Sequence, residues 1–282
     1  MVLSPAVVYT NYGIQFACAL VIASLNPLIL LSRWNRSKAN SQLTMILIHI
    51  GLHFVFAVST LMYAGAVLLF FKDDRKHSII FWTVLIYGSI LSTTALSDLF
   101  LALDRYIAIT YPIQYLVSMK SKLVLYSTFF TIAFCLSIAP ACALHRVEEK
   151  PQALMLADFV GEPTIRIILI SGMVLMILNV VVSAFFLMEL RKFNKTLLGI
   201  RQSTKVANTT VAYQMVLAGI FWVVPAVSRT VMENCFDLYI RKTLGPLTVT
   251  LVVVYMACCS VLYWTKLVPE KTSPFRTIST SR

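Results

Sequence analysis

The chain has 282 residues, of which 59% are hydrophobic and only 13% are charged, and its formal net charge is +12 at pH 7. Soluble domains usually carry about 25% charged residues because their surfaces face water. The composition therefore excludes an ordinary soluble protein and indicates a chain that is surrounded mainly by lipid.

Seven apolar stretches with almost no charge follow one another along the chain. As a helix rising about 1.5 Å per residue, each can cross a hydrocarbon core of about 30 Å. Backbone in lipid must satisfy its own hydrogen bonds, and the alternating pattern of a membrane barrel is absent. We therefore expect an all-α membrane protein, a bundle of seven transmembrane helices. The expected spans are 10–32, 43–71, 78–103, 123–144, 165–188, 206–228 and 244–265.

The segments outside these spans are short. We expect an extracellular tail at 1–9, the bundle over 10–265 and a cytoplasmic tail at 266–282, with no soluble domain that carries separate chemistry. We expect the first span to be a retained helix and not a signal peptide, because no basic residue precedes Arg33 and the span is longer than the roughly 7–15 residues of a signal's apolar region.

The distribution of Lys and Arg favours an N-terminus outside the cell. In that orientation 15 of these residues lie on the cytoplasmic side and nine on the outer side. Cytoplasmic loops usually carry the excess. The basic side suits anionic lipid or an acidic protein rather than nucleic acid. Glycosylation sequons at Asn35, Asn194 and Asn208 fall on the cytoplasmic side and favour the inverted orientation instead.

The stretch LDRYIAITYPIQY at 103–115 places an acid beside a base at the expected inner end of the third span. Boundary marking explains the residue types, because Arg and aromatic residues anchor at membrane interfaces and Pro ends helices. The order Asp104-Arg105-Tyr106, with Pro112 following, resembles the signature of rhodopsin-like G-protein-coupled receptors. The resemblance implies that Asp104 holds Arg105 at rest. On activation Arg105 would turn toward a heterotrimeric G protein, and Pro112 and a loop at 106–122 would help to dock it.

Other rhodopsin-like elements are missing or altered. The start of the sixth span has no acid, the seventh span (VYMACCSVLYW) lacks Asn-Pro-x-x-Tyr, and the outer end of the third span has no Cys. The sixth span keeps Trp222 and a kinking proline, Pro225, in FWVVP. With the short tails, this pattern resembles the nematode serpentine chemoreceptors, in particular class BC. That resemblance implies a chemosensory receptor, not an enzyme, in the plasma membrane of sensory cilia.

Asp98 is an ionisable residue deep in the third span. It lies six residues, about 9 Å, inward from Asp104, and His49 lies at a similar depth in the second span. Such residues usually face the bundle and have a partner, so we expect an Asp98–His49 pair with His53 one turn deeper. The pair is either an ion- or proton-sensitive switch or a neutral, hydrogen-bonded Asp that holds the helices together. The spacing of His49 and His53 also suits a metal, but the sequence shows no third ligand, so we expect no metal and no cofactor.

The ligand pocket is expected in the outer half of the bundle, where aromatic walls and a few polar groups suit a small molecule. Two arginines at the outer ends of the fifth and sixth spans could clamp an anionic group, although they could equally extend to the lipid headgroups. The candidates are Trp82, Tyr87, Ser89, Arg166, Ser171, Trp222, Arg229 and Tyr255.

Two further alternatives concern the cysteines and the function. Cys142 and Cys235 lie near the oxidising outer side and are the plausible disulfide, whereas the other four cysteines suit helix packing. The leading hypothesis for function is a receptor that binds a small external molecule and activates a G protein. The rival is a transporter or an intramembrane enzyme that uses Asp98, but no repeated halves or placed nucleophile support it.

Overall fold

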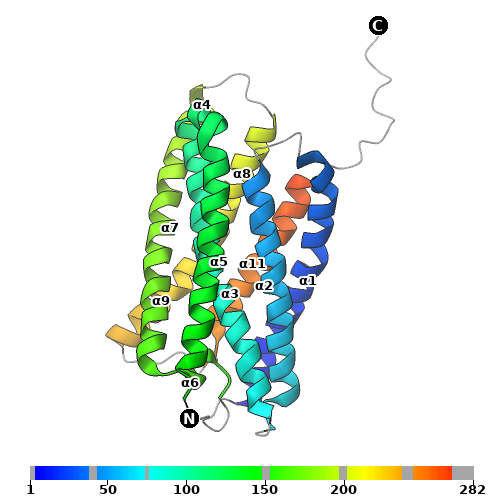
Figure 1. Ribbon diagram of the computed structural model, residues 1–282, viewed down its shortest axis with the longest axis vertical. Coiled ribbons are helices and arrows are strands. Elements are labelled where there is room, and N and C mark those ends of the chain that lie inside the picture. The colour runs from blue at the N-terminus through cyan, green and yellow to red at the C-terminus, as the bar shows by residue number, and fades with distance from the viewer. Residues whose placement is uncertain are drawn as a thin grey trace.

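The computed structural model describes residues 4–37, 43–73, 76–147, 153–196, 202–236 and 244–268. Seven of its helices are long and apolar enough to cross a membrane, and Figure 1 shows them side by side in one bundle. The predicted fold class is therefore confirmed. Apart from an isolated bridge between Arg146 and Val160, the regular structure of the described residues is helical.

Five spans are single helices and two are composite. The single ones are α1 (Pro5–Ser37), α2 (Thr44–Phe70), α3 (His77–Thr110), α7 (Glu162–Thr196) and α11 (Leu247–Leu267). The fourth span joins α4 (Pro112–Gln114), the π-helical turn η3 (Tyr115–Met119) and α5 (Lys120–Leu144). The sixth joins α8 (Gln202–Ala218), the π-helical turn η4 (Gly219–Val223) and α9 (Val224–Cys235). A short helix, α6 (Leu156–Phe159), lies between α5 and α7.

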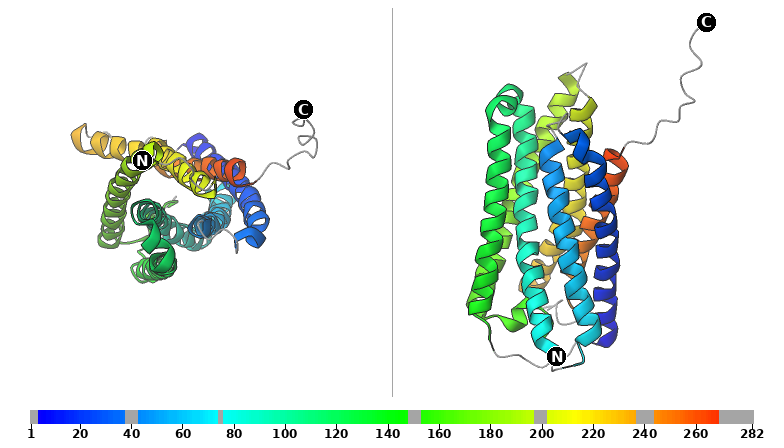
Figure 2. Two further views of the ribbon diagram at one scale, coloured as in Figure 1. Left: turned by 90° about the horizontal axis from the view of Figure 1, so that it is seen from above. Right: turned by 45° about the vertical axis from the view of Figure 1, so that its right-hand side comes forward.

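Helix α3 lies in the middle of the bundle and contacts α2, α5 and α7, while α1 packs against α2 and α11 (Figure 2). The most apolar 18-residue window of α7 contains no buried residue, although it is the most hydrophobic of the seven. An apolar helix surface that stays exposed is expected where the surrounding solvent is lipid. The polar side chains discussed below instead face the interior.

The structure differs from the predicted boundaries at two places. Helix α1 begins at Pro5, so the expected tail at 1–9 is helical from that residue. The expected loop at 106–122 is helical as well, because α3 continues to Thr110 and α4 begins at Pro112. Proline suits the first position of a helix, where its missing N–H would have no intrahelical partner. Most of the expected tail at 266–282 lies outside the described residues.

Pro225 follows the π-helical turn η4, which separates α8 from α9. Proline lacks an N–H and its ring crowds the carbonyl four residues earlier, so the helix cannot keep a regular hydrogen-bond ladder there. Figure 1 shows α9 running outward from the bundle below this point. The predicted kinking proline therefore lies where the sixth span loses its regular α-helical geometry.

Candidate functional site

Asp104, Arg105 and Tyr115 form a closed, buried network at the end of the bundle where α3 meets η3. Arg105 donates from Nε to Asp104 Oδ2 at 2.9 Å and makes a second, shorter bond from Nη2 to the same oxygen. The Tyr115 hydroxyl accepts from Arg105 Nη2 at 3.1 Å and donates to Asp104 Oδ1 at 2.8 Å. All three side chains are at most 2% exposed. Tyr115 therefore covers the Asp104–Arg105 pair at this end of the bundle.

The two other residues of the predicted motif lie outside this network. Tyr106 packs its ring 6.4 Å from that of Phe185 on α7, and Pro112 is exposed at the first position of α4. Pro112 nevertheless shapes the network, because the short turn before it reverses the chain and returns Tyr115 to Arg105. The end of the bundle thus presents an exposed α4 above a buried charge pair.

A second polar network surrounds Asp98 in the middle of the bundle. His49 Nε2 lies 3.1 Å from Asp98 Oδ1, so the structure brings together the two residues that depth counting placed at one level. Gln214 on α8 donates from Nε2 to Asp98 Oδ1 at 2.8 Å, and the Tyr255 hydroxyl on α11 lies 3.3 Å from both carboxylate oxygens. Tyr263 donates to Gln214 Oε1 at 2.6 Å. The network therefore ties α2, α3, α8 and α11 together.

A cavity of about 250 Å³ lies at the other end of the bundle, beside the segment that connects α5 to α7. Its wall is mostly apolar, and Met155, Leu156 and Ala157 of the connecting segment form part of it. Gly88 on α3 allows the close approach of this segment, because a Cβ at that position would lie only 3.0 Å from Leu156 Cδ2. The cavity is thus built between the bundle and a segment that folds against it.

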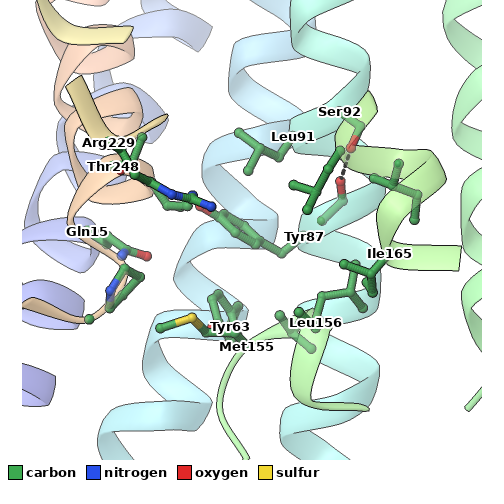
Figure 3. A pocket seen from close by; sticks show the side chains of 18 residues that line it. Gln15, Tyr63, Tyr87, Leu91, Ser92, Met155, Leu156, Ile165, Arg229 and Thr248 are labelled. Atoms are coloured by element: carbon green, nitrogen blue, oxygen red, sulfur yellow. Dashed lines mark hydrogen bonds between the residues drawn. The ribbon is translucent and has the colours of Figure 1, made fainter. Parts of the chain in front are cut away.

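The lining residues of this cavity include the polar side chains of Gln15, Tyr87 and Arg229 (Figure 3). The Tyr87 hydroxyl and Gln15 Oε1 are buried and have no hydrogen-bond partner among the residues that the structure describes. Arg229 extends its guanidinium toward Tyr87, while its Nε donates to Glu233 Oε1 at 3.0 Å. Buried polar groups without a partner are costly, so a molecule that bonds to them gains affinity. The cavity can therefore hold a small, mainly apolar molecule with one polar end.

A comparison with protein families matches residues 3–147 to the family described as Serpentine type 7TM GPCR chemoreceptor Srbc. The match covers slightly more than half of the 282 residues. The chain belongs to this family. The predicted resemblance to the nematode class BC receptors is thereby confirmed, and the Srbc chain is a multi-pass membrane protein of a chemoreceptor family rather than of an enzyme family. A comparison with curated proteins finds no match.

The Srbc structure separates the predicted pocket residues into several groups. Tyr87 and Arg229 line the cavity at the α5–α7 segment. Tyr255 belongs to the Asp98 network instead, with Trp222 packed 6.2 Å from its ring. The others do not line the cavity: Trp82 faces outward, Ser89 bonds to the Leu85 carbonyl, Arg166 forms an exposed pair with Glu162, and Ser171 lines a separate apolar groove.

The predicted disulfide is not formed in the Srbc structure. Cys142 and Cys235 are both free thiols, and Cys142 is buried whereas Cys235 is exposed at the end of α9. Other contacts fix the segment between α5 and α7. The Tyr63 hydroxyl donates to the Leu154 carbonyl at 2.8 Å, and Asp158 accepts from the Met155 backbone N–H at 2.8 Å. Hydrogen bonds and packing thus hold this segment without a covalent link.

Sequence reasoning missed Tyr115, Gln15 and Gln214. Tyr115 stands at the end of the stretch that carries the motif, but its contact with Arg105 depends on the turn at Pro112. Gln15 and Gln214 were detectable in principle, because an amide side chain inside an apolar span usually faces a polar partner. Their positions in the first and sixth spans were the available signal.

Proposed function

We propose that this Srbc protein is a G-protein-coupled receptor for a small external molecule, with its N-terminus outside the cell. The cavity beside the α5–α7 segment would then face outward and bind the ligand, and the end with Arg105 would face the cytoplasm. The observation that carries the proposal is the buried Asp104–Arg105–Tyr115 network, in a chain that belongs to a chemoreceptor family.

The cavity supports a ligand that is apolar over most of its surface and carries an anionic or acceptor group at one end. Arg229 supplies a positive charge and donors, and the Tyr87 hydroxyl supplies a further donor. Arginine recognises carboxylate groups well because its N–H groups match their geometry. A volume of about 250 Å³ suits a molecule at or below the lower end of common ligand-pocket sizes.

The buried pair supports a two-state switch at the other end. A buried ion pair gains little net stability over apolar residues, because removing both charges from water is costly. Opening the end of the bundle would release Arg105 from Asp104 and Tyr115 and expose it to a G protein. The ligand would favour this open arrangement only through a higher affinity for it.

The rival functions find less support. Ser97 Oγ lies 2.8 Å from His49 Nδ1, so a serine does accompany the Asp98–His49 pair, contrary to our expectation from the sequence. The space beside Asp98 is only about 20 Å³, however, which holds about one water molecule and no substrate. The backbone N–H groups around Ser97 lie inside α3, where helical hydrogen bonds occupy them and leave no oxyanion hole.

The test uses Arg105→Ala in cells that carry a promiscuous G protein and are exposed to pools of volatile and water-soluble metabolites. We expect active pools to signal through the wild type and to lose the signal with Arg105→Ala at an equal surface level. Arg166→Ala is the matched control, because Arg166 is exposed at the opposite end. A transporter would be insensitive to the loss of Arg105, so an unchanged response would refute the proposal.

A further inference from the structure

His49, His53 and Asp98 bring two imidazoles and a carboxylate together inside the bundle. One ligand atom from each residue lies within 4.8 Å of the others, and all three side chains are buried. The two histidines are four residues apart on α2, a spacing that places both rings on one face of a helix and is used for zinc in proteins. Asp98 on α3 supplies the third ligand that the sequence alone did not reveal.

His53 is the member of this cluster whose ring nitrogens lack partners among the described residues. Its side chain is 0% exposed, and neither ring nitrogen has a hydrogen-bond partner among the residues that the structure describes. The ring lies 4.1 Å from the His49 ring and 6.4 Å from the Tyr263 ring, centroid to centroid. Burying a polar group without a partner is costly, and each such case needs a physical reason. A bound cation would supply the partner.

The contacts of His49 and Asp98 also suit a cation. His49 Nδ1 is held by Ser97 Oγ at 2.8 Å, which leaves Nε2 facing Asp98 Oδ1 at 3.1 Å. Gln214 Nε2 lies within 3.2 Å of three atoms, namely His49 Nε2, Asp98 Oδ1 and the Tyr255 hydroxyl oxygen. Because an amide nitrogen carries only two protons, it cannot donate to all three at once. A metal-bound histidine usually donates its other ring N–H to a nearby acceptor, and Ser97 Oγ is placed to accept such a bond from His49 Nδ1.

We propose that His49, His53 and Asp98 bind a divalent transition-metal ion, with Zn²⁺ as the best fit to two imidazoles and one carboxylate. Zinc binds such nitrogens and oxygens at about 2.0–2.2 Å, and three protein ligands with one open position are a common arrangement. The three ligand atoms lie within 4.8 Å of one another, so binding one ion at these distances would require them to move closer together.

The ion would link α2 to α3 directly and balance the buried carboxylate of Asp98. Charged groups inside a membrane bundle are usually paired or coordinate an ion. The site is separate from the cavity lined by Tyr87 and Arg229, and from the Arg105 network. Zinc binding can therefore be measured without a ligand and without a G protein.

The test uses the full chain, purified in detergent, stripped with a chelator and titrated with ZnCl₂ in competition with a fluorescent zinc indicator. We expect one zinc ion per chain. Loss of a residue that only hydrogen-bonds to a metal ligand typically weakens metal binding about 10–100-fold, so His53→Ala, which removes a ligand itself, should weaken it at least about 100-fold. Zinc at a hundredfold excess over Kd should raise the wild-type midpoint of thermal unfolding by roughly 5–10 °C.

Two further variants keep the result interpretable. His145→Ala removes an exposed histidine outside the cluster and should bind zinc like the wild type. His53→Cys retains a ligand and should bind zinc with an increased preference for Cd²⁺, even if His53→Ala fails to fold. The proposal is overturned if the wild type binds no stoichiometric zinc, if folded His53→Ala binds as tightly as the wild type, or if His53→Cys leaves the Cd²⁺ preference unchanged.

Discussion

Replacing Tyr115 by Phe removes a hydroxyl group that contacts both charges of the Asp104–Arg105 pair, at 3.1 Å from Arg105 Nη2 and 2.8 Å from Asp104 Oδ1. A hydrogen bond to a charged group contributes about 1.5–3 kcal/mol. Both bonds are made by the Tyr115 hydroxyl oxygen. We therefore count the substitution as the loss of one such bond from the closed arrangement. Since about 1.4 kcal/mol corresponds to a factor of ten, the ratio of closed to open receptor should fall roughly 10- to 150-fold.

The assay is ligand-independent signalling through a promiscuous G protein, with receptors at matched surface levels. We expect Tyr115→Phe to raise this basal signal, because the ring still packs while the open arrangement becomes more populated. Tyr111→Phe is the control, because Tyr111 lies four residues before Tyr115 and its side chain is exposed. If Tyr115→Phe reaches the surface normally and its basal signal equals that of the wild type, the closed network does not hold the receptor inactive.

Three further predictions concern the cavity and the middle of the bundle. Arg229→Gln should weaken binding of carboxylate ligands about 10–100-fold and leave neutral analogues unchanged in a binding assay, while Arg166→Gln changes neither. Gly88→Ala places a Cβ 3.0 Å from Leu156 Cδ2, so hydrogen exchange in residues 153–160 should speed up as the segment is displaced. Tyr263→Phe removes a 2.6 Å hydrogen bond from the Asp98 network and should destabilise the fold by about 1–2 kcal/mol in thermal unfolding.

The seven spans were predictable because lipid imposes long, nearly uncharged helices on the sequence. The ends of the spans were less predictable from the sequence, and Pro112 shows why. A proline after an apolar run is compatible with the end of one helix and with the first turn of the next. Here it begins α4, so the expected loop is helical. Local sequence does not decide between these two roles.

The contacts of Asp98 were predictable only where depth alone decides them. Counting residues from the same membrane face placed His49 and Asp98 at one level, and they lie 3.1 Å apart. Which other side chains reach them depends on how each helix is rotated about its axis. That rotation turns Tyr255 toward Asp98 instead of toward the cavity lined by Tyr87 and Arg229, and it brings Gln214 into contact with both. Sequence periodicity is weak here, because the outward faces of these helices are also apolar.

Helix α3 passes through all three sites, with Tyr87 at the cavity, Asp98 in the middle and Arg105 at the far end. These residues are separated by 11 and seven positions, about 16 and 10 Å along the helix. A shift of α3 against α8 would strain the bond from Gln214 to Asp98, so a ligand that caused such a shift would act on this network as well as on Arg105. We expect Asp98→Asn to raise basal signalling and to act non-additively with Tyr115→Phe, by more than about 0.5 kcal/mol in a double-mutant cycle. Additive effects would mean that the two networks respond independently.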